Sequence, residues 1–138
     1  MNSLDAWTFD PRRVEKPWGW ELIWADTDRY VGKILFVAAG QSLSLQYHER
    51  KDESWYVQAG RAKLELGSSG EAVLNEVVIG PGEAFHYPPG TVHRVTALED
   101  TTILEVSTPD LDDVFLALTG HTTGKAESSQ TTMEAVPQ

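Results

Sequence analysis

The chain has 138 residues, with 11 lysines and arginines against 21 aspartates and glutamates, which gives a formal net charge of −10 at pH 7. It contains no cysteine, so disulfides, thiolate metal sites and cysteine nucleophiles are excluded. The acidity disfavours nucleic acids and anionic membrane surfaces as partners, because both require a basic surface, and no apolar run approaches the roughly 18 residues of a membrane span. We therefore expect a single soluble, cytoplasmic domain.

The two ends of the chain differ from its middle. Residues 1–15 are expected to form an N-terminal arm. Residues 119–138 are rich in Gly, Thr, Ser and Gln, and such a segment buries too little apolar surface to offset its ordering entropy. We therefore expect a disordered tail at 119–138 and a folded body at 16–118.

In the folded body, short runs rich in β-branched and aromatic residues alternate with turns that contain Gly, Pro and Asp. The expected strands are, in chain order, residues 20–25, 30–38, 42–48, 53–59, 62–66, 72–79, 84–87, 93–98 and 102–107. A last apolar segment, 111–118, fits either a short helix or a final strand. Many short strands with little helical periodicity predict an all-β sandwich or closed barrel, and closure leaves few free strand edges.

The strand expected at 42–48 has two unlike faces. One face is polar, with Ser42, Ser44, Gln46 and His48, and the other is apolar, with Leu43, Leu45 and Tyr47. Buried polar groups need partners, which a wet or metal-filled cavity would provide; an edge strand with this face in water is the alternative. The apolar face needs a cover, so we expect a homodimer.

Two further residues join Gln46 and His48 as candidate metal ligands. Glu53 opens the next expected strand after a charged hairpin, which brings it beside His48. His93 follows the rigid Pro-Pro-Gly turn at 88–90, which fixes where another strand begins. Two imidazoles, a carboxylate and an amide oxygen suit zinc, manganese or iron, and an incomplete set of protein ligands leaves a position for water or substrate.

The spacing of these residues resembles the two motifs of the cupin superfamily. Residues 40–60 match G-x5-H-x-H-x4-E-x6-G, with Gln46 in place of the first histidine, and residues 82–97 match G-x5-P-x-G-x2-H-x3-N, with Ala97 in place of the asparagine. The resemblance implies a double-stranded β-helix, the jelly-roll cupin barrel, as a single domain. It also implies one divalent metal ion, with zinc expected and manganese, iron or nickel as alternatives, held by Gln46, His48, Glu53 and His93.

A finer resemblance is to the cupin domain of type II mannose-6-phosphate isomerases (phosphomannose isomerases). The similar stretches are Lys-Pro-Trp-Gly at 16–19, Leu-Ser-Leu-Gln at 43–46 and Pro-x-Gly-Thr-Val-His-Arg at 88–94. In place of that family's histidine cluster, this chain has Glu49-Arg50. The resemblance implies a metal-dependent aldose–ketose isomerase that acts on a sugar phosphate, in which the metal stabilises an enediolate and a base moves one proton.

Three residues are candidates for the catalytic role. Lys33 lies in the middle of an apolar strand face, where an ammonium is costly unless it reaches solvent or faces a polar cavity. It is therefore a candidate for contact with the substrate phosphate or for proton transfer. Arg94 directly follows a candidate ligand, so alternation turns it away from the metal, and a salt bridge is its alternative role. His86 is either a general base or part of the wall. Lys16 and Arg50 are candidates to hold an anion near the barrel mouth.

Two other classes of function stay open. A non-catalytic cupin would use the metal for structure or to bind a sugar, since a fold does not fix its function. A cupin dioxygenase would use iron or manganese, and bound iron with oxygen consumption would identify it. Turnover of a sugar phosphate separates the isomerase from the binding protein.

Overall fold

The computed structural model describes residues 5–68, 70, 73–109, 114–117 and 133–136. A short 3-10 segment, η1 (Asp5–Trp7), precedes the strands. The strands are β1 (Arg12–Lys16), β2 (Gly19–Asp26), β3 (Val31–Val37), β4 (Gln46–His48), β5 (Glu53–Ala59), β6 (Ala62–Ser68), β7 (Asn75–Ile79), β8 (Ala84–Tyr87), β9 (Thr91–Ala97), β10 (Thr101–Ser107), β11 (Val114–Ala117) and β12 (Met133–Val136). Within the described ranges, no helix has the length and apolar character needed to cross a membrane.

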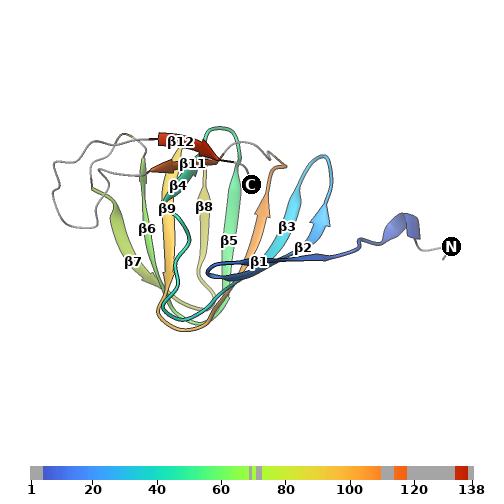
Figure 1. Ribbon diagram of the computed structural model, residues 1–138, viewed down its shortest axis with the longest axis horizontal. Helices are drawn as coiled ribbons and strands as arrows, with labels where there is room; N and C mark the ends of the chain where they lie inside the picture. Colours follow the sequence, from blue (N-terminus) through green and yellow to red (C-terminus); the bar gives the residue numbers. More distant parts are fainter. Residues whose placement is uncertain (1–4, 69, 71–72, 110–113, 118–132, 137–138) are drawn as a thin grey trace.

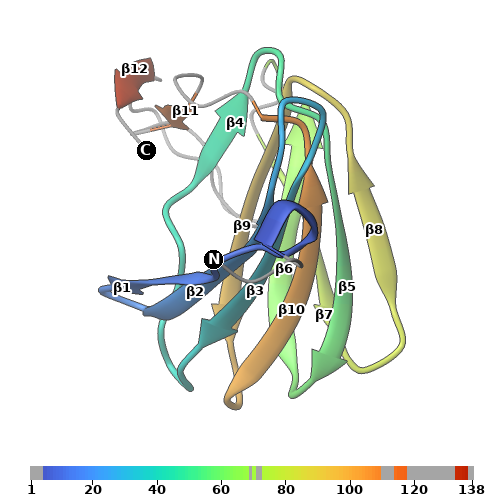
Figure 2. The same ribbon diagram turned by 90° about the vertical axis from the view of Figure 1, so that its right-hand side faces the viewer.

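The strands form two six-stranded sheets that face each other (Figures 1 and 2). The first sheet has the order β1-β2-β3-β10-β5-β8, and the second has the order β12-β11-β4-β9-β6-β7. The pairings within both sheets are antiparallel. The chain crosses repeatedly from one sheet to the other, from β3 to β4 and then to β5, which is the connectivity of a jelly roll. The all-β, jelly-roll prediction is confirmed.

The main apolar core lies between the two sheets. Its inward-facing members include Val57, Leu64, Val95 and Ile103, all of which are fully buried. Burying each such side chain stabilises the fold by about 1.5–3 kcal/mol. The core therefore fixes the two sheets against each other and holds the strand ends that carry the polar residues.

The inward face changes from apolar to polar toward one end of the barrel. Along β10 it runs from Ile103 to Glu105 and Ser107, all of which are buried. Along β5 it runs from Val57 back to Glu53, which is also buried. Because alternate residues share one face of a strand, the two strands bring their polar ends together. We call this region the polar end of the barrel.

The segment expected as one long strand at 42–48 forms a strand only at β4. Ser42 makes an isolated bridge to Thr96, and the residues between are not part of a ladder. Strict alternation therefore fails: Leu43 packs against the main core, whereas Leu45 packs in a second cluster with Leu74 and Val92. The expected continuous apolar face, on which the homodimer prediction rested, is not present.

Parts of both chain ends contribute strands to the sheets. The first sheet begins at β1, whose first four residues fall within the expected arm, because β1 pairs along its whole length with β2. The apolar segment expected at 111–118 contributes a strand, β11, which pairs with both β4 and β12. Of the expected tail, the structure describes the four residues of β12, which are ordered as a strand by that pairing; residues 118–132 and 137–138 lie outside the described residues.

Candidate metal centre

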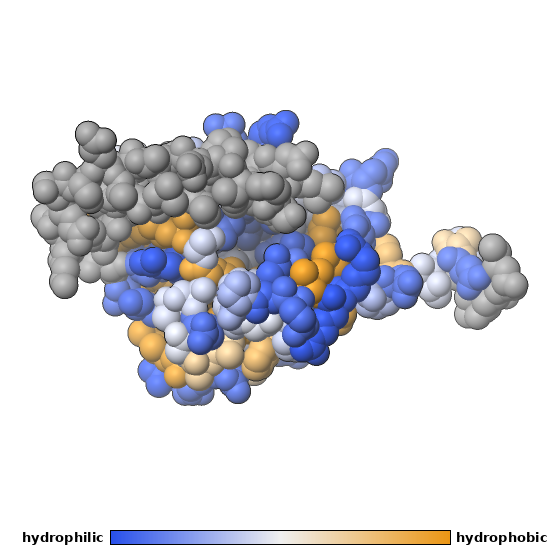
Figure 3. Space-filling view, viewed as in Figure 1, coloured by the Kyte–Doolittle hydropathy of each residue, from blue (hydrophilic) through white to orange (hydrophobic). Residues whose placement is uncertain are grey.

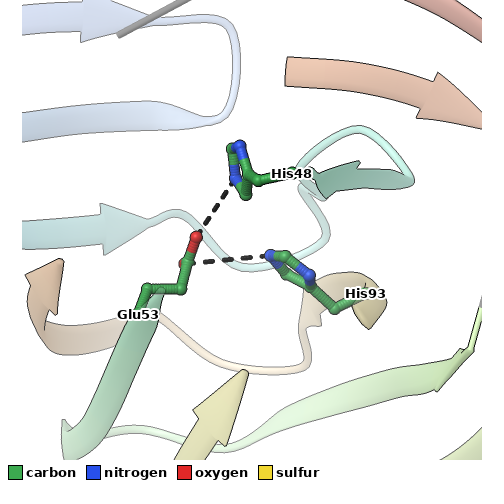
Figure 4. Close-up of side chains that lie close together, drawn as sticks. All are labelled: His48, Glu53 and His93. Atoms are coloured by element: carbon green, nitrogen blue, oxygen red, sulfur yellow. Dashed lines mark ion pairs between the residues drawn. The ribbon is translucent and has the colours of Figure 1, made fainter. Parts of the chain in front are cut away.

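Three buried side chains with metal-ligand chemistry converge at the polar end of the barrel (Figure 4). His48 ends β4, Glu53 begins β5, and His93 lies in β9. Glu53 Oε2 is 3.1 Å from His48 Nε2, and Glu53 Oε1 is 3.8 Å from His93 Nε2. One candidate ligand atom from each residue lies within 4.8 Å of the others. We call these three residues the His-Glu-His triad.

A turn locks the two histidines of the triad to each other. Gly90, with a φ of 90°, closes the Pro-Pro-Gly turn at 88–90, and its amide donates to the carbonyl oxygen of His48 at 2.6 Å. The Thr91 hydroxyl and amide both donate to the Pro88 carbonyl oxygen, at 2.8 Å and 3.1 Å. The start of β9 is therefore tied to the end of β4, and His93 follows three residues after the tie.

The tautomer of His93 is fixed by the backbone. Its Nδ1 lies 3.0 Å from the carbonyl oxygen of Thr91. A carbonyl can only accept, so Nδ1 carries the proton and Nε2 presents a lone pair to the triad. Burial lowers the pKa of His93, which keeps the imidazole neutral. Tyr87 stacks on the ring at 4.6 Å and Trp55 meets it edge-on at 5.7 Å, so the ring cannot turn.

Glu53 is held as a carboxylate. Burial alone would raise the pKa of Glu53, but the hydrogen bond with His48 and the charge of Lys51 lower it to about 2. The His93 Nε2 lone pair therefore faces an anionic oxygen. A cation between them would turn this repulsion into two attractive contacts.

An unsatisfied buried atom beside the triad is consistent with a bound cation or ligand. Glu53 Oε2 contacts His48 Nε2 at 3.1 Å and Lys51 Nζ at 3.8 Å, but the buried Tyr87 hydroxyl has no hydrogen-bond partner within the part of the chain that the structure describes. Buried polar atoms normally have a hydrogen-bond partner, so this site is suited to bind a polar ligand. The donor set of two imidazoles and one carboxylate fits a divalent transition metal and leaves coordination positions for other ligands.

Gln46 is placed beside the triad. It pairs directly with His93 across β4 and β9, so both side chains leave the sheet on the same face. Its amide nitrogen donates to the Ser44 hydroxyl at 3.1 Å, which occupies the nitrogen and not the oxygen of the amide. Gln46 as a fourth ligand stays a prediction.

Two buried charges beside the triad escaped the sequence analysis, Lys51 and Glu105. Lys51 Nζ lies 3.8 Å from Glu53 Oε2 and 3.7 Å from Glu105 Oε2. Burial alone would lower the pKa of Lys51, but the carboxylates of Glu105 and Glu53 outweigh this effect and raise the pKa above its usual value. The ammonium therefore stays charged. Glu105 also accepts hydrogen bonds from Trp55 Nε1 at 3.1 Å and from the Ser107 hydroxyl at 3.0 Å. The available signal for Glu105 was an acid at an inward position of a strand, in register with the apolar Ile103.

Of the three candidate catalytic residues, Lys33 alone faces the interior of the barrel. It pairs across the sheet with inward-facing Glu105, and its side chain is 12% exposed. Its Nζ lies 3.5 Å from Glu21 Oε2. The polar environment predicted for an ammonium on this apolar strand face is therefore present.

The other two candidates lie away from the triad. The Arg94 guanidinium donates two hydrogen bonds to Glu65, Nε to Oε1 at 2.8 Å and a terminal nitrogen to Oε2 at 3.1 Å, on the face of β9 opposite His93. His86 pairs with Ser54 on the outer face of the first sheet. It contacts Asp52 at 2.5 Å, and its side chain is 58% exposed. We retain neither Arg94 nor His86 as a catalytic candidate, because strand alternation turns both away from the interior.

The comparisons with known proteins agree with this architecture. The cupin domain model matches residues 34–107. A mannose-1-phosphate guanylyltransferase of Escherichia coli (strain K12) is 37% identical over 83 residues, which are 59% of this chain and 16% of that protein. Mannose-1-phosphate guanylyltransferase 2 of Escherichia coli O157:H7 is 30% identical over 109 residues, which are 75% of this chain and 21% of that protein. The chain thus spans about a fifth or less of the length of these relatives.

Solved structures show the same fold. KdgF from Halomonas sp. is 28% identical with a TM-score of 0.60, and the match covers 74% of this chain and 94% of that chain. Oxalate decarboxylase from Lactobacillus farciminis is 20% identical with a TM-score of 0.68, and the match covers 80% of this chain and 35% of that chain. With the matched family model, the jelly-roll topology and the His-Glu-His triad in agreement, the chain belongs to the cupin family.

Proposed function

We propose that the chain is a metal-dependent aldose–ketose isomerase that interconverts mannose 6-phosphate and fructose 6-phosphate. The observation that carries the proposal is the buried His-Glu-His triad, beside which the buried Tyr87 hydroxyl has no hydrogen-bond partner among the described residues. The names of two relatives, both mannose-1-phosphate guanylyltransferases, support a mannose phosphate as the substrate class. The sequence resemblance to type II phosphomannose isomerases supports the reaction.

We assign the metal to His48, Glu53 and His93, with Gln46 as the fourth protein ligand and zinc as the expected ion. When bound, the metal supplies Lewis-acid stabilisation of negative charge on the two substrate oxygens next to the migrating proton. The residues of the chain prepare this site. Thr91 holds His93 Nε2 unprotonated through the Nδ1 hydrogen bond, and Lys51 balances the buried charge of Glu53.

The test is turnover by a preparation whose metal content is known. The full chain is stripped with a chelator and reloaded with zinc, manganese or iron, and interconversion of the two sugar phosphates is followed in each case. We expect activity that depends on the metal and is lost in Glu53→Gln. The control is His86→Gln, which lies on the outer face and is expected to keep full activity.

Each negative result identifies an alternative. Sugar-phosphate binding without turnover in every metal form would refute the isomerase and favour a non-catalytic binding cupin. Oxygen consumption by the iron form, without isomerisation, would favour a dioxygenase. The similarity to oxalate decarboxylase does not decide between these, because at 20% identity it concerns the fold.

We also propose a homodimer, on a different surface from the one that the sequence suggested. Exposed apolar side chains, Trp24, Tyr56 and Val106 among them, lie on the outer face of the first sheet. Covering such a face would remove apolar area from water. Sedimentation at several concentrations tests the dimer, and Val106→Lys is expected to shift the equilibrium toward the monomer.

A further inference from the structure

A cavity of about 230 Å³ lies between the β1–β2 hairpin and the polar end of the barrel. Its walls come from both edges of this gap, from β1, β2 and β3 on one side and from the segments around residues 51 and 107 on the other. Figure 3 shows hydrophilic side chains gathered over β1 beside a hollow in the surface. The charged side chains that line the cavity are Arg12, Lys16, Lys33, Lys51, Glu21 and Asp26.

The cavity is positively charged in a chain that is strongly negative. It gathers four of the chain's 11 lysines and arginines. Lys51 is compensated by Glu53 and Glu105, and the other three, Arg12, Lys16 and Lys33, stand against Glu21 and Asp26, which leaves an excess of one positive charge in a chain of net charge −10. An acidic protein that used its basic residues only for solubility would scatter them over its surface. Their concentration around one cavity indicates an anionic ligand.

The cations around this cavity are loosely paired. Arg12 lies 3.4 Å from Asp26, while Lys33 and Lys16 share the single carboxylate of Glu21 at 3.5 Å and 3.8 Å. Charge-assisted hydrogen bonds are shorter, at about 2.7–2.9 Å. These acids therefore keep the cations in place without using all of their donors, and a second anion can be accepted.

The position of the cavity connects it to the triad. Lys51 lines the cavity and lies 3.8 Å from Glu53 Oε2. The volume is below the roughly 300–1,000 Å³ of a complete small-molecule pocket, so the cavity suits one end of a ligand whose other end reaches the metal. A phosphomonoester presents three strong acceptor oxygens, one for each of the three cations Arg12, Lys16 and Lys33 that line the cavity, whereas a carboxylate presents two.

We propose that this cavity binds the phosphate group of the ligand, with Lys33 of β3 and with Arg12 and Lys16 of the β1–β2 hairpin as its contacts. The proposal deepens the proposed function, on which it rests for the identity of the sugar. It assigns Lys33 to anion binding. It also gives the β1–β2 hairpin a direct part in ligand recognition.

Phosphate binding is measured by titration calorimetry on the full chain, with inorganic phosphate, acetate, mannose and mannose 6-phosphate as separate probes. We expect inorganic phosphate to bind more tightly than acetate. Lys33→Gln is expected to weaken phosphate and mannose 6-phosphate by about tenfold or more, as the loss of one charge-assisted contact does, and to leave mannose unaffected. Arg12→Gln is expected to weaken phosphate binding in the same way. Because Arg12 is an exposed residue of the hairpin, its substitution should not impair folding.

The matched control is Lys63→Gln. Lys63 is also a partly buried lysine paired with a glutamate, Glu76 at 3.9 Å, but it lies in β6 away from the cavity. Unchanged phosphate affinity in both Lys33→Gln and Arg12→Gln, or acetate binding as tight as phosphate, would overturn the proposal. Phosphate binding without isomerisation would refute the proposed reaction but not the proposed anion site. Isomerisation that is unchanged in Lys33→Gln and Arg12→Gln would refute the anion site but not the reaction.

Discussion

Replacement of Lys51 by methionine tests whether the buried charges of the polar end compensate one another. The substitution keeps an unbranched side chain of similar length and removes the ammonium that lies between Glu53 and Glu105, at 3.8 Å and 3.7 Å. Each of these contacts is worth about 4 kcal/mol before desolvation, at an effective dielectric constant of about 20. Desolvation of the buried ammonium offsets several kcal/mol of this sum, so the expected net loss is about 3–5 kcal/mol for the metal-free chain.

A bound metal should reduce this loss. A divalent cation on Glu53 compensates that carboxylate in place of Lys51, so the variant leaves one uncompensated acid instead of two. The measurement is urea unfolding followed by tryptophan fluorescence, with chelator and then with saturating zinc. Lys63→Met is the matched control, since its half-exposed pair with Glu76 predicts a loss of about 0–1 kcal/mol.

Two results would refute the reasoning about Lys51. A loss below about 1 kcal/mol in the metal-free chain, the range of a surface pair, would show that the ammonium does not stabilise the two carboxylates. An equal loss with and without zinc would show that the metal does not bind at Glu53.

Three more predictions follow from the same region and from the turns. Burial lowers the pKa of His93, so the unfolded chain binds this proton more readily than the folded chain. The metal-free protein should therefore lose stability as the pH falls below about 6.5. In His93→Gln, the free energy of unfolding in urea should depend less on pH between about pH 6.5 and 5. Gly60→Ala should cost at least about 2 kcal/mol, because φ is 89° and the new Cβ would lie 2.2 Å from a backbone oxygen; Gly40→Ala, with φ of 83° and no atom within 4 Å, should cost less in the same unfolding assay. Trp55→Phe should cost about 1.5–3 kcal/mol through the lost hydrogen bond to Glu105. A loss below about 1 kcal/mol in the same urea-unfolding assay would contradict this.

The strands were predictable because alternation is a local signal. Each inward position of β5 and β10 can be read from the sequence, and so can the place of the triad, because His48, Glu53 and His93 stand at or near strand ends with turns before them. The irregular backbone at 42–45 was not predictable in this way. It results from separate hydrogen bonds to β9, such as Leu43 N–H to the Val95 carbonyl oxygen, which no local pattern specifies.

Among the charged residues of the polar end, some could be predicted from the local sequence pattern and others could not. Lys33 was found because a single lysine interrupts an apolar strand face, and the cost of burying it points to a polar cavity. Lys51 was missed because it lies in a charged hairpin that has the composition of a solvated turn. Its burial depends on Glu105, which is 54 residues away in the chain and is brought close by the pairing of β5 with β10.

The hydrogen bond from the Gly90 amide to the His48 carbonyl oxygen is a backbone contact, so it would hold the candidate ligands His48 and His93 in place whether or not an ion is bound. Binding of a metal by the proposed site would then carry little conformational cost. Exchanging one ion for another of similar radius would then alter the electronic character of the centre, while the polypeptide would still determine the positions of the ligand atoms.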